Sequence, residues 1–600
     1  MKRILPAPFL LALVLSFHHS AARAQSNPEV TAAELLKHVR YLASDQLEGR
    51  KAGSKGAELA AQYVANEFKR YSLKPLGDQG TYFQSFEFVA GIELGVLNTL
   101  SYTFRGRSTS TVVNRDFRPL GFSSSESFTG DLVFAGYGIS APGNNYNDYD
   151  GIDPQGKAVL VLRNAPPSDS TRNFTQFSSL RYKAAKAREL GVKALVIVTG
   201  PADSDTDELL KLSYDQSTGN AGIPAVHVTR KVADELLRPT GKTISDLEKR
   251  IISTGTPQST PVAGVTLSMT VELKEIRQST KNIIGYLEGN DPLLKDQLVI
   301  LGAHHDHLGF GGEGSGSLKP DTVAVHNGAD DNASGTAGLL ELAQAFAVSQ
   351  GSLKRSMLFI SFAGEEMGLL GSAHYVKNPT VPLERAIVMI NMDMIGRLNH
   401  RALLIGGIGT SAGFEDLVNK HNADSAFVLK LTKDGFGPSD HASFYGKQIP
   451  VFHFWTDLHP DYHRASDDYD RINYEGMEQV ARYIWKIASD LGEAPDKPQY
   501  VAVAAPRPMG RSTRVYMGTI PDFGGESEGM KISGVREGSP AAKAGLQGGD
   551  VIIKFGKVDV KNLYDFSYAL GEYKPDDEVD IVVKRGTEIK TMRVKLEKRN

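Results

Sequence analysis

The chain has 600 residues, of which 41% are apolar, 23% charged and 8% aromatic, and its formal net charge at pH 7 is -3. These values exclude disordered, collagen-like and multi-span membrane proteins. The length predicts about four domains, and the nearly balanced charge without long runs of one sign disfavours a nucleic-acid partner. The sequence contains no cysteine, which excludes disulfides, thiol catalysis and zinc–thiolate sites. Any bound metal must therefore be held by His, Asp and Glu.

Residues 1–24 have the pattern of a secretory signal peptide. Lys2 and Arg3 precede an apolar stretch over residues 4–17, and residues 22–24 (Ala-Arg-Ala) form a small-x-small cleavage site. The alternative is a membrane anchor, but the stretch contains two prolines and is shorter than the about 20 residues of a spanning helix. We therefore predict a secreted or periplasmic protein with no transmembrane anchor after cleavage.

Residues 25–116 are predicted to form an N-terminal helical flank of the main domain. Thr31 and Glu34 have the spacing of a capping box at the start of an apolar helical pattern. A second helical pattern follows, with apolar residues at Ala60, Val64 and Phe68.

The rest of the chain divides into four segments by its texture. Residues 117–262 predict an inserted α/β module with little chemistry of its own, with short apolar strand runs separated by Gly, Asn and Pro. Residues 263–494 alternate apolar strand runs with helices, which is typical of a mixed, mostly parallel sheet flanked by helices. Prolines mark a linker at 495–510, and residues 511–600 predict a small β-rich module.

The groups that carry chemistry gather in the second of these segments, residues 263–494. Eleven of the 15 histidines lie between residues 300 and 463. Three apolar strand runs, at 297–303, 356–363 and 386–392, are each followed by acids or imidazoles, namely His304-His305-Asp306-His307, Glu365-Glu366 and Asp393. Because ligands bind at the carboxyl ends of strands in open α/β sheets, we expect these side chains to share one crevice.

Further acidic and imidazole groups flank these strands. An acidic, glycine-bounded segment at residues 328–335 precedes a predicted helix at 336–346, and Ser439-Asp440-His441 and Asp461-Tyr462-His463 follow downstream. Carboxylates gathered in one crevice repel one another unless cations neutralise them. The pattern therefore predicts a divalent metal site, and imidazole and carboxylate ligands favour zinc while leaving manganese and cobalt open.

Taken together, these motifs resemble those of the secreted co-catalytic zinc aminopeptidases, family 28 of the metallopeptidases. That family also includes glutamate carboxypeptidases and the transferrin receptor ectodomain. The resemblance covers nearly the whole mature chain and rests on GAHHD (302–306), GADDNASG (328–335), GEEMGLLGS (364–372), NMDMIG (391–396), SDHASF (439–444) and DYHRASDD (461–468). It implies a zinc exopeptidase fold, a protease-associated (PA) domain at 117–262 and a C-terminal PDZ domain.

The resemblance also implies a set of site residues. Two zinc ions would be held by His304 and Asp393 on one side and by Glu366 and His463 on the other, with Asp331 bridging them. Glu365 would be the general base, and Tyr462 would hydrogen-bond the tetrahedral oxyanion. The peptide bond between Asp331 and Asn332 would be cis, as it is in relatives.

Neighbouring residues receive supporting roles. His305 and His307 are expected to pack or to form hydrogen bonds rather than to bind metal, and Asp306 to orient a ligand imidazole. Asp440 and His441 either brace the site or are purely structural. Asp330 stands where relatives often have Asn or Ile, which leaves its role open.

The function implied is removal of N-terminal residues from peptides. Three alternatives remain: a carboxypeptidase for acidic C-terminal residues, a glutaminyl cyclase, and a receptor-like binding protein without the metal site. The carboxypeptidases use an arginine patch, and here Arg397 is the only basic residue we place near the site. In the PDZ-like module, residues 516–519 are expected to receive the carboxylate of a C-terminal peptide beside an open strand edge, unless the module only packs.

Overall fold

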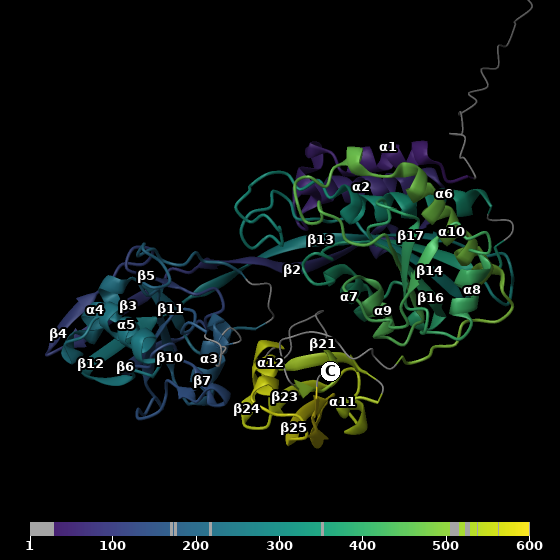
Figure 1. The fold of residues 1–600 in the computed structure, drawn as a ribbon. Helices are drawn as coiled ribbons and strands as arrows, with labels where there is room; N and C mark the ends of the chain where they lie inside the picture. Colours follow the sequence, from purple (N-terminus) through teal and green to yellow (C-terminus); the bar gives the residue numbers. More distant parts are fainter. Residues whose placement is uncertain are drawn as a thin grey trace, which may run out of the picture.

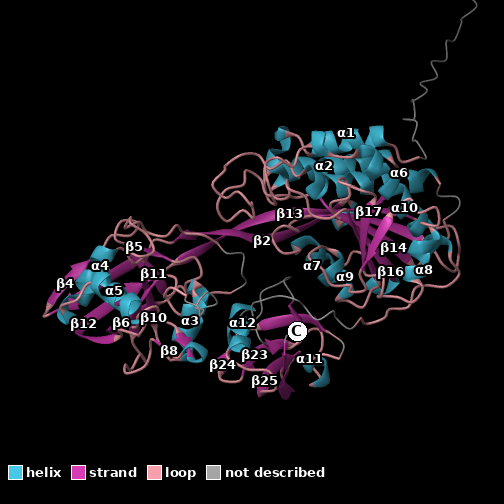
Figure 2. Cartoon of the chain, viewed as in Figure 1, coloured by secondary structure: helices cyan, strands magenta, loops and turns pink. Residues whose placement is uncertain are grey.

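The computed structural model describes residues 29–598 except 169–171, 173, 175–176, 215–218, 350–352, 504–514, 522–527, 537 and 562. Its larger sheets have nine, eight and six strands, and each belongs to a different lobe of the molecule (Figure 1). Figure 2 shows that helices surround the nine-stranded sheet, whereas the C-terminal lobe is mostly strand. The mixed α/β fold with a β-rich C-terminal module is confirmed. The predicted signal peptide lies outside the described residues.

The nine-stranded sheet carries the acidic and imidazole motifs. Its strand order is β1-β13-β15-β14-β16-β19-β17-β18, with β2 pairing β13; the last two strands are β17 (Ala402–Gly406) and β18 (Val428–Leu431). The four central strands run parallel: β15 (Ser356–Phe362), β14 (Leu298–His304), β16 (Ala386–Met392) and β19 (Val451–Trp455). All but the first residue of β16 and the last of β19 are buried in these strands, as continuous apolar runs of a parallel sheet require. Their carboxyl ends therefore meet at one edge.

Helices cover both faces of this sheet. One face packs against α1 (Ala32–Leu42), α2 (Lys55–Arg70), α6 (Gly335–Val348) and α10 (Tyr474–Glu493). The other face packs against α7 (Leu370–Lys377) and α9 (His441–Tyr445), on the opposite side of the sheet in Figure 1. Helix α6 is buried along nearly its whole length, and so is the acidic segment Ala329–Ser334 directly before it.

The N-terminal helices begin as the sequence predicts, but beyond Tyr71 the predicted helical flank is mostly strand, with one short 3-10 helix at Asp78–Gly80. Thr31 accepts a hydrogen bond from the N–H of Glu34 at 3.3 Å, which caps α1, and Ser54 caps α2 in the same way. Strands β1 (Lys74–Pro75), β2 (Phe83–Leu94), β3 (Thr99–Phe104) and β4 (Arg107–Ser110) follow. The start of β2 alternates between buried and exposed residues, a strand period rather than a helical one.

A long antiparallel ribbon connects the first lobe to the second. It consists of β2 and β13 (Leu273–Leu287) and is visible between the two lobes in Figure 1. The eight-stranded sheet beyond it has the order β4-β3-β12-β6-β9-β10-β11-β5, in which β12 spans Thr260–Thr270. This sheet extends beyond the interval 117–262 at both ends, because β3 pairs with β12 across the start and finish of the insertion.

The second lobe is an α/β unit, as the sequence predicts. Its remaining elements are β5 (Phe117–Pro119), β6 (Ser127–Phe134), β9 (Ala158–Leu162), α3 (Leu180–Glu189), β10 (Ala194–Val198), β11 (Ala225–Val228), α4 (Arg230–Leu237) and α5 (Ile244–Thr254). Strands β6, β9, β10 and β11 are parallel to one another and form the buried centre of the lobe.

The C-terminal lobe contains the six-stranded sheet and touches both other lobes. Its elements include β21 (Thr519–Pro521), β22 (Met530–Val535), β23 (Val551–Phe555), β25 (Glu578–Arg585), β26 (Glu588–Lys595) and α12 (Leu563–Gly571). The Arg188 guanidinium of α3 lies 2.8 Å from the Asp565 carboxylate of α12, and Arg536 lies 2.8 Å from Asp434 of the first lobe. In the described part of the chain, no helix is long and apolar enough to cross a membrane.

Candidate metal centre

The predicted site residues come to one edge of the nine-stranded sheet from separate elements. His304 is the last residue of β14, Asp393 follows β16 directly, and Glu365 and Glu366 follow β15. Asp331 lies in the irregular turn Ala329–Ser334 before α6. Parallel strands bring three of these segments together, as the strand-end pattern predicts.

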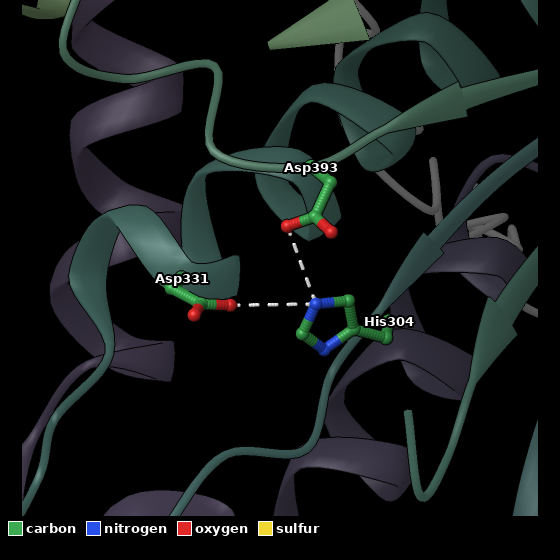
Figure 3. A group of neighbouring side chains, drawn as sticks. All are labelled: His304, Asp331 and Asp393. Atoms are coloured by element: carbon green, nitrogen blue, oxygen red, sulfur yellow. Dashed lines mark hydrogen bonds and ion pairs between the residues drawn. The ribbon is translucent and has the colours of Figure 1, made fainter. Parts of the chain in front are cut away.

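A first group of donor atoms surrounds the end of β14. His304 Nε2 lies 3.4 Å from Asp331 Oδ1 and 3.3 Å from Asp393 Oδ1. Figure 3 draws both contacts as dashed lines. All three donor atoms lie within 4.8 Å of one another. One imidazole nitrogen and two carboxylate oxygens at this spacing match the ligand types of a zinc site.

Outward hydrogen bonds hold this group in place. His304 Nδ1 donates to the main-chain oxygen of Asp306 at 3.2 Å, so that Nε2 faces the two carboxylates. Ser439 Oγ donates to Asp393 Oδ2 at 2.7 Å and leaves Oδ1 directed inward. The expectation that Asp306 orients the imidazole therefore finds support in its carbonyl group, since its carboxylate lies farther away, at 3.7 Å.

A second group lies on the other side of Asp331. His463 Nε2 is 3.1 Å from Asp331 Oδ2 and 3.2 Å from Glu366 Oε2. The two oxygens of Asp331 thus face different groups, Oδ1 the first and Oδ2 the second. This is the arrangement that a carboxylate bridging two cations requires.

The second group is also fixed from outside. His463 Nδ1 donates to the main-chain oxygen of Gly316 at 3.0 Å. His307 Nδ1 lies 2.6 Å from Glu366 Oε1, which leaves Oε2 for the group around His463. In both groups one atom of each imidazole and each terminal carboxylate is bonded outward and the other faces inward, as metal ligands require. The residues present therefore fit two divalent ions.

The charges of the two groups reinforce this conclusion. Burial lowers the pKa of His304, but the carboxylates of Glu365, Asp393 and Asp331 outweigh it and raise that pKa well above the usual value. Burial likewise opposes the charged form of His463, whereas its bonds to Asp331 and Glu366 raise its pKa to about 10. Burial raises the pKa of Asp331, and its hydrogen bonds to both imidazoles bring it well below the usual value. The crevice thus strongly favours positive charge between its carboxylates.

Glu365 is held beside the first group without belonging to it. Its N–H donates to Asp306 Oδ1 at 3.1 Å, and its Oε2 lies 3.8 Å from His304 Nε2. Burial raises the pKa of its carboxyl well above the usual value, and the negative charges of Asp393 and Glu366 add to the effect. A carboxylate with a raised pKa in a crevice is suited to accept a proton.

Tyr462 lies against the second group. Its ring stacks on that of His463 with the centroids 3.9 Å apart and the planes inclined by 23°. Burial and the carboxylates of Asp331 and Glu366 raise the pKa of the phenol, so the hydroxyl keeps its proton and can donate a hydrogen bond.

Several residues that support the site had no assigned part in the sequence motifs. Arg50 is fully buried and donates to the main-chain oxygens of His305, Asn327 and Gly328, which ties the segments around His304 and Asp331 together. Asp467 accepts hydrogen bonds from the N–H groups of Asp330 and Asp331. In the sequence, Arg50 is a lone arginine far from the motifs, and nothing there predicts its role. Asp467 lies inside DYHRASDD, so the sequence does show an acidic residue close to His463.

Four further acids and histidines of the motifs are buried, namely Asp330, Asp440, His441 and His305. Asp330 lies 3.3 Å from His459, and its side chain also accepts the N–H of Gly396 at 2.7 Å, which gives this residue a bracing contact. His441 stacks on His453 at 4.3 Å, and Asp440 is fully buried. His305 bonds Ser361 at 3.0 Å, away from the two groups. The peptide bond Asp331–Asn332 is cis, as expected.

Comparison with known proteins agrees with this geometry. The model of peptidase family M28 matches residues 282–488, that of the PA domain residues 128–236 and that of the PDZ domain residues 515–596. Aminopeptidase YwaD of Bacillus subtilis (strain 168) is 25% identical over 378 residues, which cover 61% of this chain and 70% of that protein.

One further relative covers more of the chain, and a solved structure is also similar to it. The probable lipoprotein aminopeptidase LpqL of Mycobacterium tuberculosis (strain ATCC 25618 / H37Rv) is 24% identical over 556 residues, covering 82% of this chain and 95% of that protein. The solved structure of an aminopeptidase from Aneurinibacillus sp. strain AM-1 has a TM-score of 0.48 and 23% identity, covering 81% of this chain and all of that one. Residues 282–488 therefore match peptidase family M28, and the chain also carries segments that match a PA domain and a PDZ domain.

Proposed function

We propose that the chain is a two-zinc aminopeptidase that releases N-terminal residues from peptides. The observation that carries the proposal is the position of Asp331, whose Oδ1 faces His304 and whose Oδ2 faces His463. His304, Asp331 and Asp393 would hold one ion, and Asp331, Glu366 and His463 the other. Zinc suits imidazole and carboxylate ligands in the absence of thiolate, and manganese and cobalt use the same atoms.

The protein's own groups then divide the reaction between them. Bound divalent ions would supply polarisation of the scissile carbonyl and a water with a pKa of about 7. Glu365 Oε2 would take the proton of that water and pass it to the leaving amine. The Tyr462 hydroxyl would donate to the oxygen on which negative charge develops.

Recognition of the peptide's N-terminus would come from the same carboxylates. We propose that Glu365 and Asp393 also face the substrate's α-ammonium. A unit charge about 4 Å from a carboxylate gains about 4 kcal/mol at an effective dielectric constant of about 20. This attraction favours an aminopeptidase. A carboxypeptidase would need a cation for the substrate's C-terminal carboxylate, and Arg397 is already engaged with Asp461 at 2.5 Å and with the main-chain oxygen of Arg471 at 2.7 Å.

One peptide panel tests the proposal. The purified chain is incubated with matched peptides that are free, N-acetylated or C-amidated, with and without chelator. We expect hydrolysis of free and C-amidated peptides, little hydrolysis of acetylated ones, and loss of all activity with chelator. Equal hydrolysis of acetylated and free peptides would contradict the aminopeptidase assignment, and selective loss on amidation would indicate a carboxypeptidase.

We also propose that the chain acts outside the cytoplasm and that its PDZ domain receives a peptide C-terminus. The leader pattern of residues 1–24 and the similarity to a probable lipoprotein aminopeptidase support the first point. Strand β21 is an edge strand of its sheet, which supports the second because an extended peptide adds to such an edge.

A further inference from the structure

We propose that His307 is a positioning residue for the second ion, acting through Glu366. The inference deepens the proposed two-metal function and rests on it. His307 Nδ1 lies 2.6 Å from Glu366 Oε1. An ionised carboxylate only accepts, so the imidazole carries its proton on Nδ1 and donates it. Oε1 is then occupied and Oε2 stays beside His463 Nε2, at 3.2 Å.

The position of His307 is fixed by groups that are remote in sequence. Its N–H donates to the main-chain oxygen of Arg50 at 3.2 Å, and its side chain is completely buried. Gly328 forms one wall of its pocket: a Cβ there would lie 2.5 Å from His307 Cδ2, and the backbone has a φ of +54°. The ring therefore has no room to swing away from Glu366.

Geometry favours this role over direct coordination. The donor atoms of His307, Asp331 and Glu366 do lie within 4.8 Å of one another, so His307 is close enough to be considered as a ligand. Its Nδ1, however, is already at hydrogen-bond distance from the ligand oxygen, and its ring meets that of His463 edge-on at 5.8 Å. His463 offers Nε2 to both Asp331 and Glu366 and completes the second group without His307.

The experiment measures zinc affinity in variants of the full chain. Dissociation constants of both ions are determined by competition with a chromophoric chelator for the wild type, His307→Ala and His307→Asn. His307→Ala should weaken one of the two ions about 10–100-fold, the usual effect of removing an outer-shell partner. His307→Asn places an N–H near the Nδ1 position and should recover most of the loss. In the His463→Ala background, His307→Ala should not weaken the remaining ion further.

His305→Asn is the matched control. This neighbouring histidine is equally buried but bonds Ser361, so its replacement should leave both zinc constants unchanged even if it lowers thermal stability. The proposal is overturned if His307→Ala leaves both constants unchanged or weakens both equally. It is also overturned if Asn fails to rescue and a cobalt-loaded variant shows loss of a nitrogen ligand, which would make His307 a ligand itself. A wild-type chain that binds only one ion overturns the two-metal function instead.

Discussion

The PA domain and the peptidase crevice both bury carboxylates, but they neutralise them differently. In the PA domain, Asp148 and Lys183 are fully buried. Asp148 accepts the N–H groups of Tyr137 and Ile139 at 3.0 and 3.1 Å and the hydroxyl of Tyr146 at 2.8 Å. Burial raises the pKa of Asp148 and the charge of Lys183 opposes that rise. Burial lowers the pKa of Lys183 to about 7, and its amine donates to the main-chain oxygen of Tyr137. The chain thus meets this acid with its own hydrogen-bond donors and a buried lysine.

The peptidase crevice lacks such a lysine among its described residues. The side chains of Asp331, Glu365, Glu366 and Asp393 converge there with exposures of 6–13%. Arg50 is buried beside this crevice, but its guanidinium donates to main-chain oxygens rather than to these carboxylates. The crevice's own cations are the imidazoles of His304 and His463, whose pKa values these carboxylates raise, and they are fewer than the four acids, so ions from outside would relieve the remaining repulsion. This contrast explains why we interpret Asp148 as a structural acid and the four acids of the crevice as part of a metal site.

The largest expected effect is that of Asp331→Ala, which removes the oxygen donors shared by both groups. We expect loss of both ions and a fall in turnover of at least about 10⁴-fold, because the whole catalytic unit depends on them. His463→Ala should lose mainly one ion. Elemental analysis and a peptide assay measure both effects. Asp148→Ala, which removes the buried acid of the PA domain, should keep both ions. Retention of tightly bound metal by Asp331→Ala would show that the comparison is wrong.

The neighbouring acids Glu365 and Glu366 should separate by function. Glu365→Gln should keep both ions and the fold and lose about 10²–10⁴-fold in turnover, the usual contribution of a positioned base. Glu366→Gln should instead impair metal loading, since its Oε2 faces His463 at 3.2 Å. Metal content and turnover are measured side by side. If both variants lose metal, the division of labour between the two glutamates fails.

Removing the internal cation of the PA domain should destabilise that domain and leave the metal centre unchanged. Lys183→Met leaves Asp148 without its positive neighbour and should lower the free energy of unfolding by about 3–5 kcal/mol. Adding Asp148→Asn should restore part of it. Hydrogen exchange of PA-domain peptides during urea unfolding provides the measurement. Lys157→Met is the control: its ion pair with Asp153, at 3.6 Å, is largely exposed and should contribute less than about 1 kcal/mol. Equal effects at the two lysines would refute the role of Lys183.

The smallest effect concerns pH and again separates the two regions. Burial lowers the pKa of His227 to about 4, in a PA-domain site where it bonds Thr199 at 2.9 Å. The unfolded chain binds its proton near pH 6.5, so stability from neutral His227 is complete above that pH and falls by about 3 kcal/mol as the pH drops to about 4. Unfolding of the PA domain between pH 7 and 4 should show this slope, and His227→Gln should flatten it. An unchanged slope in that variant would assign the acid sensitivity elsewhere.

Local pattern was enough for the elements that carry the site. The apolar runs at 297–303, 356–363 and 386–392 predicted strands β14, β15 and β16 to within one residue at each end, because a fully buried parallel strand needs such a run. The acids and imidazoles that follow them could be placed at one edge for the same reason. The absence of cysteine then restricted the metal ligands to His, Asp and Glu.

Only the tertiary structure decided the contacts between segments that lie far apart in the chain. The ribbon of β2 and β13 joins strands nearly 200 residues apart and turned part of the expected helical flank into sheet. Arg50 reaches the carbonyls beside His304 and Asp331 from the N-terminal segment, and His307 meets Glu366 from the neighbouring strand. Periodicity reports which face of an element is buried, but not which distant group will lie against it. The ligand types could therefore be predicted from the sequence, whereas the groups that hold each ligand in place depend on the packing of the whole domain.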